Sequence, residues 1–170
     1  GKVVLDIGCG PRGSLVWASM AARRIGLDPL ADDYLKLGAS QHAMEYLAMP
    51  SEHIPLPTSS CDIVCSFNSL DHVDDVDATV HEIKLVTRSG GLFLLLVEVN
   101  HEPTACEPHM LTPRGLIESL QPEFSCESLA IYKPSSGGVY EAIGQGQLVP
   151  DPLDAKLPGW LSARFHRQAH

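Results

Sequence analysis

A glycine-rich turn near the start of the chain constrains the fold more than any other feature. Residues 3–7 (VVLDI) are mostly apolar and β-branched, which predicts a short buried strand. Gly8, Gly10 and Gly13 follow in the spacing G-x-G-x-x-G. Apolar residues within 14–24 predict a helix directly after the glycines. Because glycine lets the backbone turn tightly and approach a ligand closely, this strand, turn and helix predict a ligand site at the start of the helix.

An acidic residue before the turn indicates which ligand fits there. Asp6 precedes the first glycine of the motif by two positions. A dinucleotide would place its pyrophosphate at the start of the helix, where a carboxylate would repel it. A ligand that carries an ammonium and a sulfonium group would instead be attracted. Asp6 therefore argues against NAD and favours a cationic ligand.

The stretch Asp6-Ile7-Gly8-Cys9-Gly10 resembles the first motif, D-x-G-x-G, of the class I S-adenosylmethionine (SAM) dependent methyltransferases. The order of predicted elements extends this resemblance over roughly residues 2–147. It implies a cofactor, SAM, and an enzyme that transfers a methyl group to a small-molecule acceptor. Two alternatives stay open: a non-catalytic methyltransferase-like module for binding or interaction and, less favoured, an NAD-dependent oxidoreductase.

Predicted strands and helices alternate along the chain. We expect strands over 25–27, 44–49, 62–67 and 92–99, helices over 31–37, 75–87 and 113–120, a loop over 50–60 and a turn over 89–91. This alternation predicts an α/β fold with a doubly wound, mostly parallel seven-stranded sheet and helices on both faces.

The end of the chain is expected to complete the sheet and then leave it. Residues 124–132 and 139–144 flank Ser-Ser-Gly-Gly and predict a C-terminal antiparallel hairpin. We therefore divide the chain into a SAM-binding Rossmann-like domain, residues 1–149, and a proline-rich connector with a C-terminal tail, residues 150–170. Within the second part, 159–170 is expected to be a short helix or a tail. Family members usually carry helices before the first strand that help to close the substrate pocket, so we expect either that the sequence is trimmed before this strand or that a lid comes from elsewhere.

Composition narrows the partners. The net charge is −9, and Lys and Arg form no long run, which argues against a broad nucleic-acid groove. The longest apolar run, 92–97, is too short to span a bilayer. The five cysteines match no zinc spacing and are expected to be reduced thiols in a cytoplasmic protein. We expect a small-molecule acceptor, no nucleic acid and no membrane partner, and a homodimer stays open.

The loops that follow the predicted strands are expected to hold the cofactor, because ligands of parallel sheets bind beyond the carboxyl ends of the strands. Asp28 ends the second strand, where an acid can bind two ribose hydroxyls, although it could also be a turn residue before Pro29. In the family, an acid before a stretch like 54–57 binds the adenine amino group, and Pro50 stands there in this chain, so Ser51 or Glu52 must substitute. The stretch 67–73 resembles the segment along the methionine part of SAM. The expected cofactor contacts are Asp6, Gly8, Cys9, Gly10, Asp28, Pro29, Ser51, Glu52, Phe67 and Asn68.

Three histidines are candidates for the chemistry. His72 can act as a general base because imidazole titrates near neutrality, although it could also be a polar residue near a helix start. His101 and His109 lie in loop 98–109, which is dense in His, Cys and carboxylate side chains. We favour an acceptor pocket there over a plain solvated loop. A metal is conceivable but not expected, because the spacing matches no closed zinc site.

Overall fold

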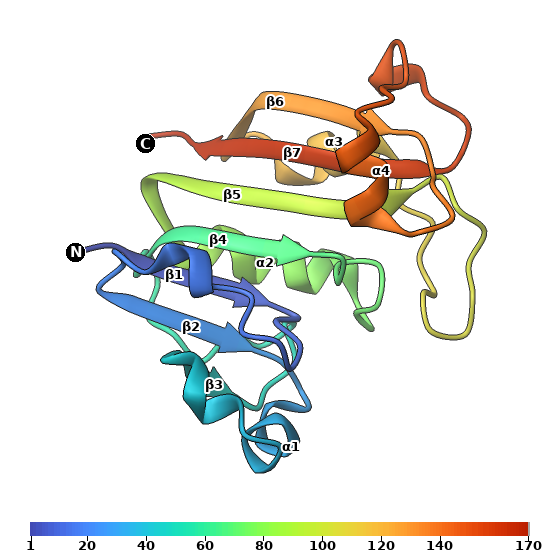
Figure 1. Ribbon diagram of the computed structural model, residues 1–170. Coiled ribbons are helices and arrows are strands. Elements are labelled where there is room, and N and C mark those ends of the chain that lie inside the picture. Colours follow the sequence, from blue (N-terminus) through green and yellow to red (C-terminus); the bar gives the residue numbers. More distant parts are fainter. Residues whose placement is uncertain (170) are drawn as a thin grey trace.

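The computed structural model describes residues 1–169 as one seven-stranded sheet with the strand order β3-β2-β1-β4-β5-β7-β6 (Figure 1). The strands are β1 (Val3–Ile7), β2 (Arg23–Leu27), β3 (Glu45–Leu47), β4 (Cys61–Phe67), β5 (Thr87–Val99), β6 (Phe124–Tyr132) and β7 (Gly159–Arg167). The first five strands are mutually parallel, and β7 runs antiparallel to both β5 and β6. The predicted fold class is thus confirmed.

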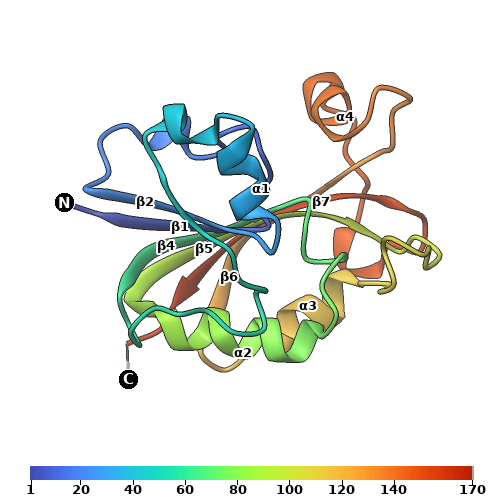
Figure 2. The same cartoon turned by 90° about the horizontal axis from the view of Figure 1, so that it is seen from below.

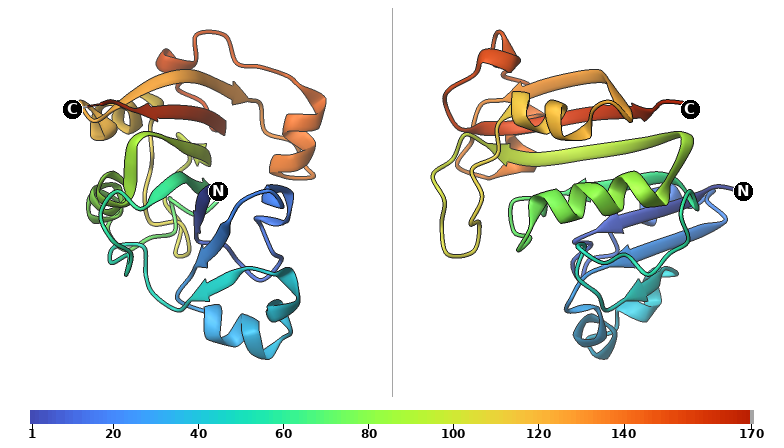
Figure 3. Two further views of the ribbon diagram at one scale, coloured as in Figure 1. Left: turned by 90° about the vertical axis from the view of Figure 1, so that its left-hand side faces the viewer. Right: turned by 180° about the vertical axis from the view of Figure 1, so that it is seen from behind.

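Helices cover both faces of this sheet (Figure 2). The helices are α1 (Ala31–Lys36), α2 (Val76–Val86), α3 (Pro113–Leu120) and α4 (Val139–Gln145), with 3-10 turns η1 (Val16–Ala18), η2 (Ala39–His42) and η3 (Pro152–Asp154). The pair α2 and α3 lies on one face, and α1 and α4 lie on the other (Figures 2 and 3). No helix among residues 1–169 is long and apolar enough to cross a membrane.

The main core lies between the sheet and the pair α2 and α3. Phe93 of β5 stacks on Phe165 of β7 with ring centroids 5.9 Å apart, and Phe124 of β6 meets Phe93 edge-on at 6.4 Å. Val80 and Ile83 of α2 are buried in the same cluster. Because aromatic pairs stabilise beyond the area that they bury, these three rings tie the antiparallel end of the sheet to its parallel part.

Both helices of this face begin as the sequence predicts. The Asp75 carboxylate accepts a hydrogen bond from Ala78 N at 2.9 Å at the start of α2. The Thr112 hydroxyl accepts one from Gly115 N at 3.1 Å at the start of α3, and Pro113 occupies the first helical position. Each cap satisfies a backbone donor that the helix itself leaves free.

The helix expected over residues 14–24 is wrong. These residues form turns and η1, and the chain enters β2 at Arg23. The glycine turn occupies the chain as far as residue 13, and Ala22 N already donates to Lys2 O at the opposite end of the sheet, at 2.8 Å. Too few residues remain between these points for a regular helix and two turns. Trp17 and Met20 are exposed as a result.

The expected C-terminal hairpin pairs β6 with the wrong segment. Residues 139–144 lie in α4, and β6 pairs instead with β7. The helix or tail expected over 159–170 is therefore wrong as far as Arg167. Leu161, Ala163 and Phe165 are buried and alternate with more exposed residues, which is the period of a strand. We propose that the folded domain extends to Arg167 and does not end at 149.

The turn expected at residues 89–91 forms part of a bulge at the start of β5. Cys61 pairs with Thr87, but Ile63 pairs with Leu92, so residues 88–91 have no partners in β4. Gly90 has a φ of 71°, which glycine adopts at little cost. The glycines thus produce a kink within one strand and not a connection between two elements.

Truncation of Phe165 tests whether β7 is part of the cooperative fold. Phe165→Ala is expected to lower the free energy of unfolding by about 3–5 kcal/mol, because it leaves a cavity beside Phe93 and Phe124. Urea unfolding followed by circular dichroism measures the change. Tyr140→Ala, an exposed aromatic residue of α4, is the matched control and should change stability by less than about 0.5 kcal/mol. Equally small effects of both changes would contradict a structural role for β7.

Candidate active site

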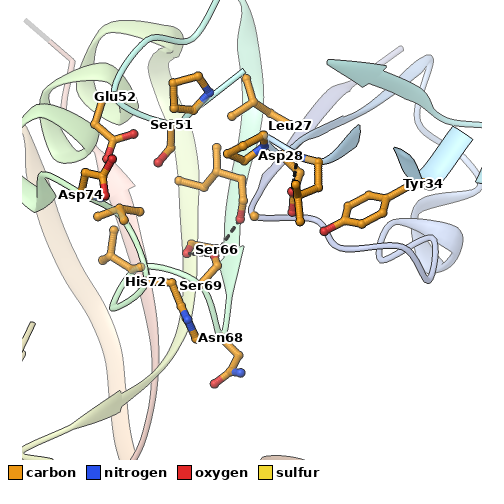
Figure 4. Close-up of a pocket in the computed structure, with 17 residues that line it drawn as sticks. Leu27, Asp28, Tyr34, Ser51, Glu52, Ser66, Asn68, Ser69, His72 and Asp74 are labelled. Atoms are coloured by element: carbon orange, nitrogen blue, oxygen red, sulfur yellow. Dashed lines mark hydrogen bonds between the residues drawn. The ribbon is translucent and has the colours of Figure 1, made fainter. Parts of the chain in front are cut away.

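A cavity of about 430 Å³ opens at the carboxyl ends of β1, β2 and β4 (Figure 4). This volume lies in the range typical of small-molecule sites. Asp28 and Tyr34 lie on one side of the cavity, and Glu52, His72 and Asp74 lie on the other (Figure 4). The position of the cavity is the one that the parallel topology predicts.

The structure brings together part of the predicted site. Seven predicted residues line the cavity: Gly8, Asp28, Pro29, Ser51, Glu52, Asn68 and His72. Six do not line it: Asp6, Cys9, Gly10, Phe67, His101 and His109. Asp6 and Cys9 are buried behind the turn, and Phe67 packs with the smaller core near η1. Tyr34 and Ser66 also line the cavity, although no sequence motif pointed to them, and Ser69 belongs to the stretch 67–73 that was expected there. Tyr34 lies in the helix after β2 and Ser66 lies at the end of β4, so both are close to strand ends.

The glycine turn is fitted closely to the loop after β4. The Ser69 hydroxyl donates to Ile7 O at 2.8 Å and lies 2.8 Å from the Ser66 hydroxyl (Figure 4). A Cβ atom at Gly8 would lie 2.2 Å from Ser69 Cβ, and Gly8 has a φ of 66°. Both the close approach and the left-handed backbone therefore require glycine at this position.

Asp28 connects the glycine turn to α1. Its Oδ2 accepts a hydrogen bond from Gly10 N at 3.1 Å, and its Oδ1 accepts one from Leu30 N at 3.0 Å. These two bonds fix the orientation of the carboxylate at the cavity wall, where it can accept hydrogen bonds from ligand hydroxyls. Burial, together with the negative charge of Asp28, raises the pKa of Tyr34 to about 12, so Tyr34 keeps its hydroxyl proton.

Asp6 is a buried acid directly behind this wall. It is 1 % exposed, and its Oδ1 has no hydrogen-bond partner among residues 1–169. Burial, and to a smaller extent the negative charge of Asp28, raise the pKa of the Asp6 carboxyl to about 7. Its carboxyl therefore titrates near neutral pH, next to the turn that the sequence singles out.

Ser51 and Glu52 are both held by residues near α2. Ser51 Oγ lies 3.1 Å from Thr79 Oγ1. Glu52 Oε1 accepts hydrogen bonds from Asp74 N at 2.8 Å and Asp75 N at 3.0 Å. Both of these bonds use the same oxygen of Glu52, so the other oxygen is the one that can meet a ligand.

A second group of titratable side chains lies next to the cavity, between the loops that follow β4 and β5. His72 Nε2 lies 3.8 Å from Asp71 Oδ1 and 3.8 Å from Glu107 Oε1. His101 Nε2 lies 3.6 Å from Asp71 Oδ2. Burial raises the pKa of Asp71, Glu107 adds to this rise, and the two histidines oppose it. Of these four side chains only His72 lines the cavity, so the group forms its outer border.

His109 does not line the cavity and instead makes a hydrogen bond to the backbone. Its Nε2 lies 2.8 Å from Val73 O, and because a carbonyl oxygen only accepts, this nitrogen carries the proton and donates it. His109 thereby ties the loop after β5 to the loop after β4.

Two solved structures with the same fold are named as putative methyltransferases. A putative methyltransferase from Bacillus halodurans C-125 superimposes with a TM-score of 0.74 at 16% identity, covering 99% of this chain and 94% of that chain. A putative SAM-dependent methyltransferase from Listeria monocytogenes gives a TM-score of 0.72 at 17% identity, covering 99% and 92%. Together with the glycine turn and Asp28, the architecture is that of a class I, Rossmann-like methyltransferase domain.

The sequence gives the family directly. Residues 5–95 match the model of the family described as "Methyltransferase domain", so the chain belongs to that family, whose cofactor is SAM. A malonyl-[acyl-carrier protein] O-methyltransferase from Yersinia pestis is 41% identical over 97 residues, which cover 55% of this chain and 36% of that protein. The chain thus matches little more than a third of the length of this curated relative.

The raised pKa of Asp6 predicts a pH dependence of stability. The unfolded chain would bind this proton only below about pH 4, whereas the folded chain binds it up to about pH 7. Between these values the folded state holds more protons, so the free energy of unfolding falls as pH rises. Asp6→Asn removes this contribution of Asp6 protonation, so the free energy of unfolding should fall less steeply between pH 4 and pH 7.

Urea unfolding of both proteins at several pH values measures this difference. Asp32→Asn, an exposed acid of α1, is the matched control and should leave the pH profile unchanged. Parallel profiles for the wild type and Asp6→Asn would show that Asp6 titrates normally.

Proposed function

We propose that the protein transfers the methyl group of SAM to a small-molecule acceptor. The observation that carries this proposal is the cavity wall made by the glycine turn and Asp28, at the carboxyl ends of β1 and β2. Family membership supplies the cofactor, and the wall supplies a place for it. SAM provides a methyl group on a sulfonium, which a nucleophile can take directly.

The residues that line or lie behind the cavity form three groups, each of which suits one part of SAM. Asp28 is held by two backbone donors and would accept hydrogen bonds from the ribose hydroxyls. Pro50, Ser51 and Glu52 also line the cavity and would border the adenine. Gly8 and Asn68 would lie along the methionine part, and the buried charge of Asp6 behind the turn favours a positive ligand there. The fit is therefore favourable for each part of SAM.

Negative charge on the acceptor side disfavours an anionic acceptor. His72 leads from the cavity to Asp71 and Glu107, and Glu98 is close enough that both acids raise its pKa, after the larger effect of burial. These carboxylates would repel a free carboxylate on the acceptor, so we favour a hydroxyl or an amine. The malonyl group named for the Yersinia pestis relative is the acceptor to test against this choice.

We assign to His72 the role of accepting the proton that the acceptor loses. It is partly exposed and lines the cavity next to Asn68 (Figure 4). As the acceptor atom bonds to the methyl carbon, its proton would pass to His72 or to solvent. The wall residues contribute mainly by holding the acceptor in line with the methyl group.

Binding measurements test the proposal. Calorimetric titration should give micromolar dissociation constants for SAM and S-adenosylhomocysteine and no measurable binding of NAD. Tight NAD binding without SAM binding would favour an oxidoreductase. Binding of none of the three would favour a non-catalytic interaction module.

Asp28→Asn should weaken SAM binding by about 1–3 kcal/mol, the usual loss when a hydrogen bond to a charged group is removed. Asparagine retains an oxygen for one of the two backbone donors, so the turn is less disturbed than with alanine. Calorimetry with SAM measures the change, and Asp32→Asn is again the matched control. Unchanged affinity in Asp28→Asn would place the ribose elsewhere.

A further inference from the structure

Asp71 is a fully buried acid, 0 % exposed, and neither of its carboxylate oxygens has a hydrogen-bond partner within the described part of the chain. Two histidines lie near it, His72 at 3.8 Å and His101 at 3.6 Å, and both distances are longer than a hydrogen bond. An unsatisfied buried carboxylate is costly, so both oxygens call for a positive partner.

His101 has the same unsatisfied arrangement from the other side. It is 7 % exposed, and its Nδ1 lies 2.9 Å from Glu102 O. Because that carbonyl only accepts, Nδ1 carries a proton, and in the neutral ring Nε2 then presents its lone pair to Asp71. Nε2 has no hydrogen-bond partner among residues 1–169. A backbone carbonyl that fixes one ring nitrogen while the other faces a shared point is the usual support of a metal-binding histidine.

We propose that Asp71, His72, His101 and Glu107 form a binding site for a divalent transition-metal ion. Asp71 and His72 come from the loop after β4, and His101 and Glu107 come from the loop after β5. These loops emerge at the same end of the sheet (Figure 1). This assignment departs from the expectation of no metal, because spacing along the sequence does not show which side chains two loops bring together.

The distances suit an ion after a small contraction. Donor atoms of Asp71, His72 and Glu107 all lie within 4.8 Å of one another. Two atoms held at about 2.1 Å from one ion stand about 3.0–3.4 Å apart in tetrahedral or octahedral geometry. The separations of 3.6 and 3.8 Å exceed this range by a few tenths of an ångström to about half an ångström for these three pairs. His101 lies outside the group of donors that are all within 4.8 Å of one another, so it must move further than the other three to join them on one ion.

The ligand set selects the kind of ion. Two imidazoles with two carboxylates suit Zn²⁺, Co²⁺, Mn²⁺ or Fe²⁺, whereas Mg²⁺ prefers oxygen ligands alone. His72 and Glu107 are partly exposed, so the ion can enter from solvent, while Asp71 and His101 form the buried base.

The two loops are held together independently of the ion. His109 donates from one loop to Val73 O of the other at 2.8 Å. Asn100 N donates to Leu111 O at 2.8 Å and closes the base of the loop after β5. The ligands are therefore brought close by contacts that involve none of their own donor atoms, which lowers the cost of ordering them.

An ion at this position would border the acceptor through His72, and this step rests on the proposed function. A bound cation offsets the negative charge of Asp71, Glu98 and Glu107 and can hold a hydroxyl of the acceptor while lowering its pKa. With the ion bound, His72 Nε2 would be a ligand and could not accept the proton of the acceptor, which would then pass to solvent.

Metal binding is measured on the full chain without any acceptor. After dialysis against a chelator, calorimetry with Zn²⁺ and with Co²⁺ should show one ion per chain, and Mg²⁺ should bind far more weakly. Visible absorption of the Co²⁺ form reports nitrogen and oxygen ligands. Glu107→Gln and His101→Ala should each weaken binding about 10–100-fold. His81→Ala, an exposed histidine of α2, is the matched control and should bind as the wild type does.

Three results would overturn the site. The first is the absence of stoichiometric Zn²⁺ or Co²⁺ binding. The second is unchanged affinity in Glu107→Gln, a partly exposed position whose change should not affect folding. The third is a thiolate charge-transfer band in the Co²⁺ form, which would assign the ion to the exposed Cys106. SAM titrations of the same samples distinguish failure of the metal site from failure of the proposed function, because SAM and the metal ion can each bind without the other.

Discussion

The parallel register of β1 between β2 and β4 is the constraint on which the site depends. Ile7 lies level with Leu27 on one side and with Ser66 on the other. The residues that follow these positions therefore leave the sheet together, and Gly8, Asp28 and Asn68 reach one cavity. A shift of one residue in either pairing would turn side chains to the opposite face and separate the glycine turn from its partners. The cavity is thus a consequence of backbone pairing before any side chain contributes.

Buried acids at the two ends of the sheet differ in how many positive or hydrogen-bonding partners they have. Asp62, at the amino end of β4, receives Lys2 at 3.0 Å, Arg88 at 2.7 Å and the backbone of Val3 at 2.7 Å. These partners lower its pKa despite the opposing effect of burial. Asp6 and Asp71, at the carboxyl end, are more deeply buried and lack comparable partners in the described chain. Buried acids that the fold leaves unsatisfied thus lie at the end of the sheet where we propose that cationic ligands bind.

The sequence predicted the parallel half of the fold and part of the cavity wall because their signals are local. The apolar run 3–7 before the glycines and Asp28 at the end of a strand each report on structure within a few residues. The antiparallel end was mispredicted because the partner of β6 follows α4, and only the alternation of Leu161, Ala163 and Phe165 indicated a strand. The sequence did not indicate a role for Asp71, because its neighbours His101 and Glu107 belong to the loop after β5, about 30 residues or more further along the chain. Pairings between distant segments need the sheet order, which no short motif carries.

The position of β7 has a consequence for how the chain is made. It follows β6 in sequence but lies between β5 and β6 in the sheet. During synthesis, the long apolar β5 therefore has one unpaired edge until Gly159–Arg167 has left the ribosome, and β6 has no strand to join. An unpaired edge of this kind can pair with the same edge of another nascent chain. Crowded polysomes should thus be the setting in which this protein aggregates most readily, and a chaperone that covers β5 would protect it until β7 inserts.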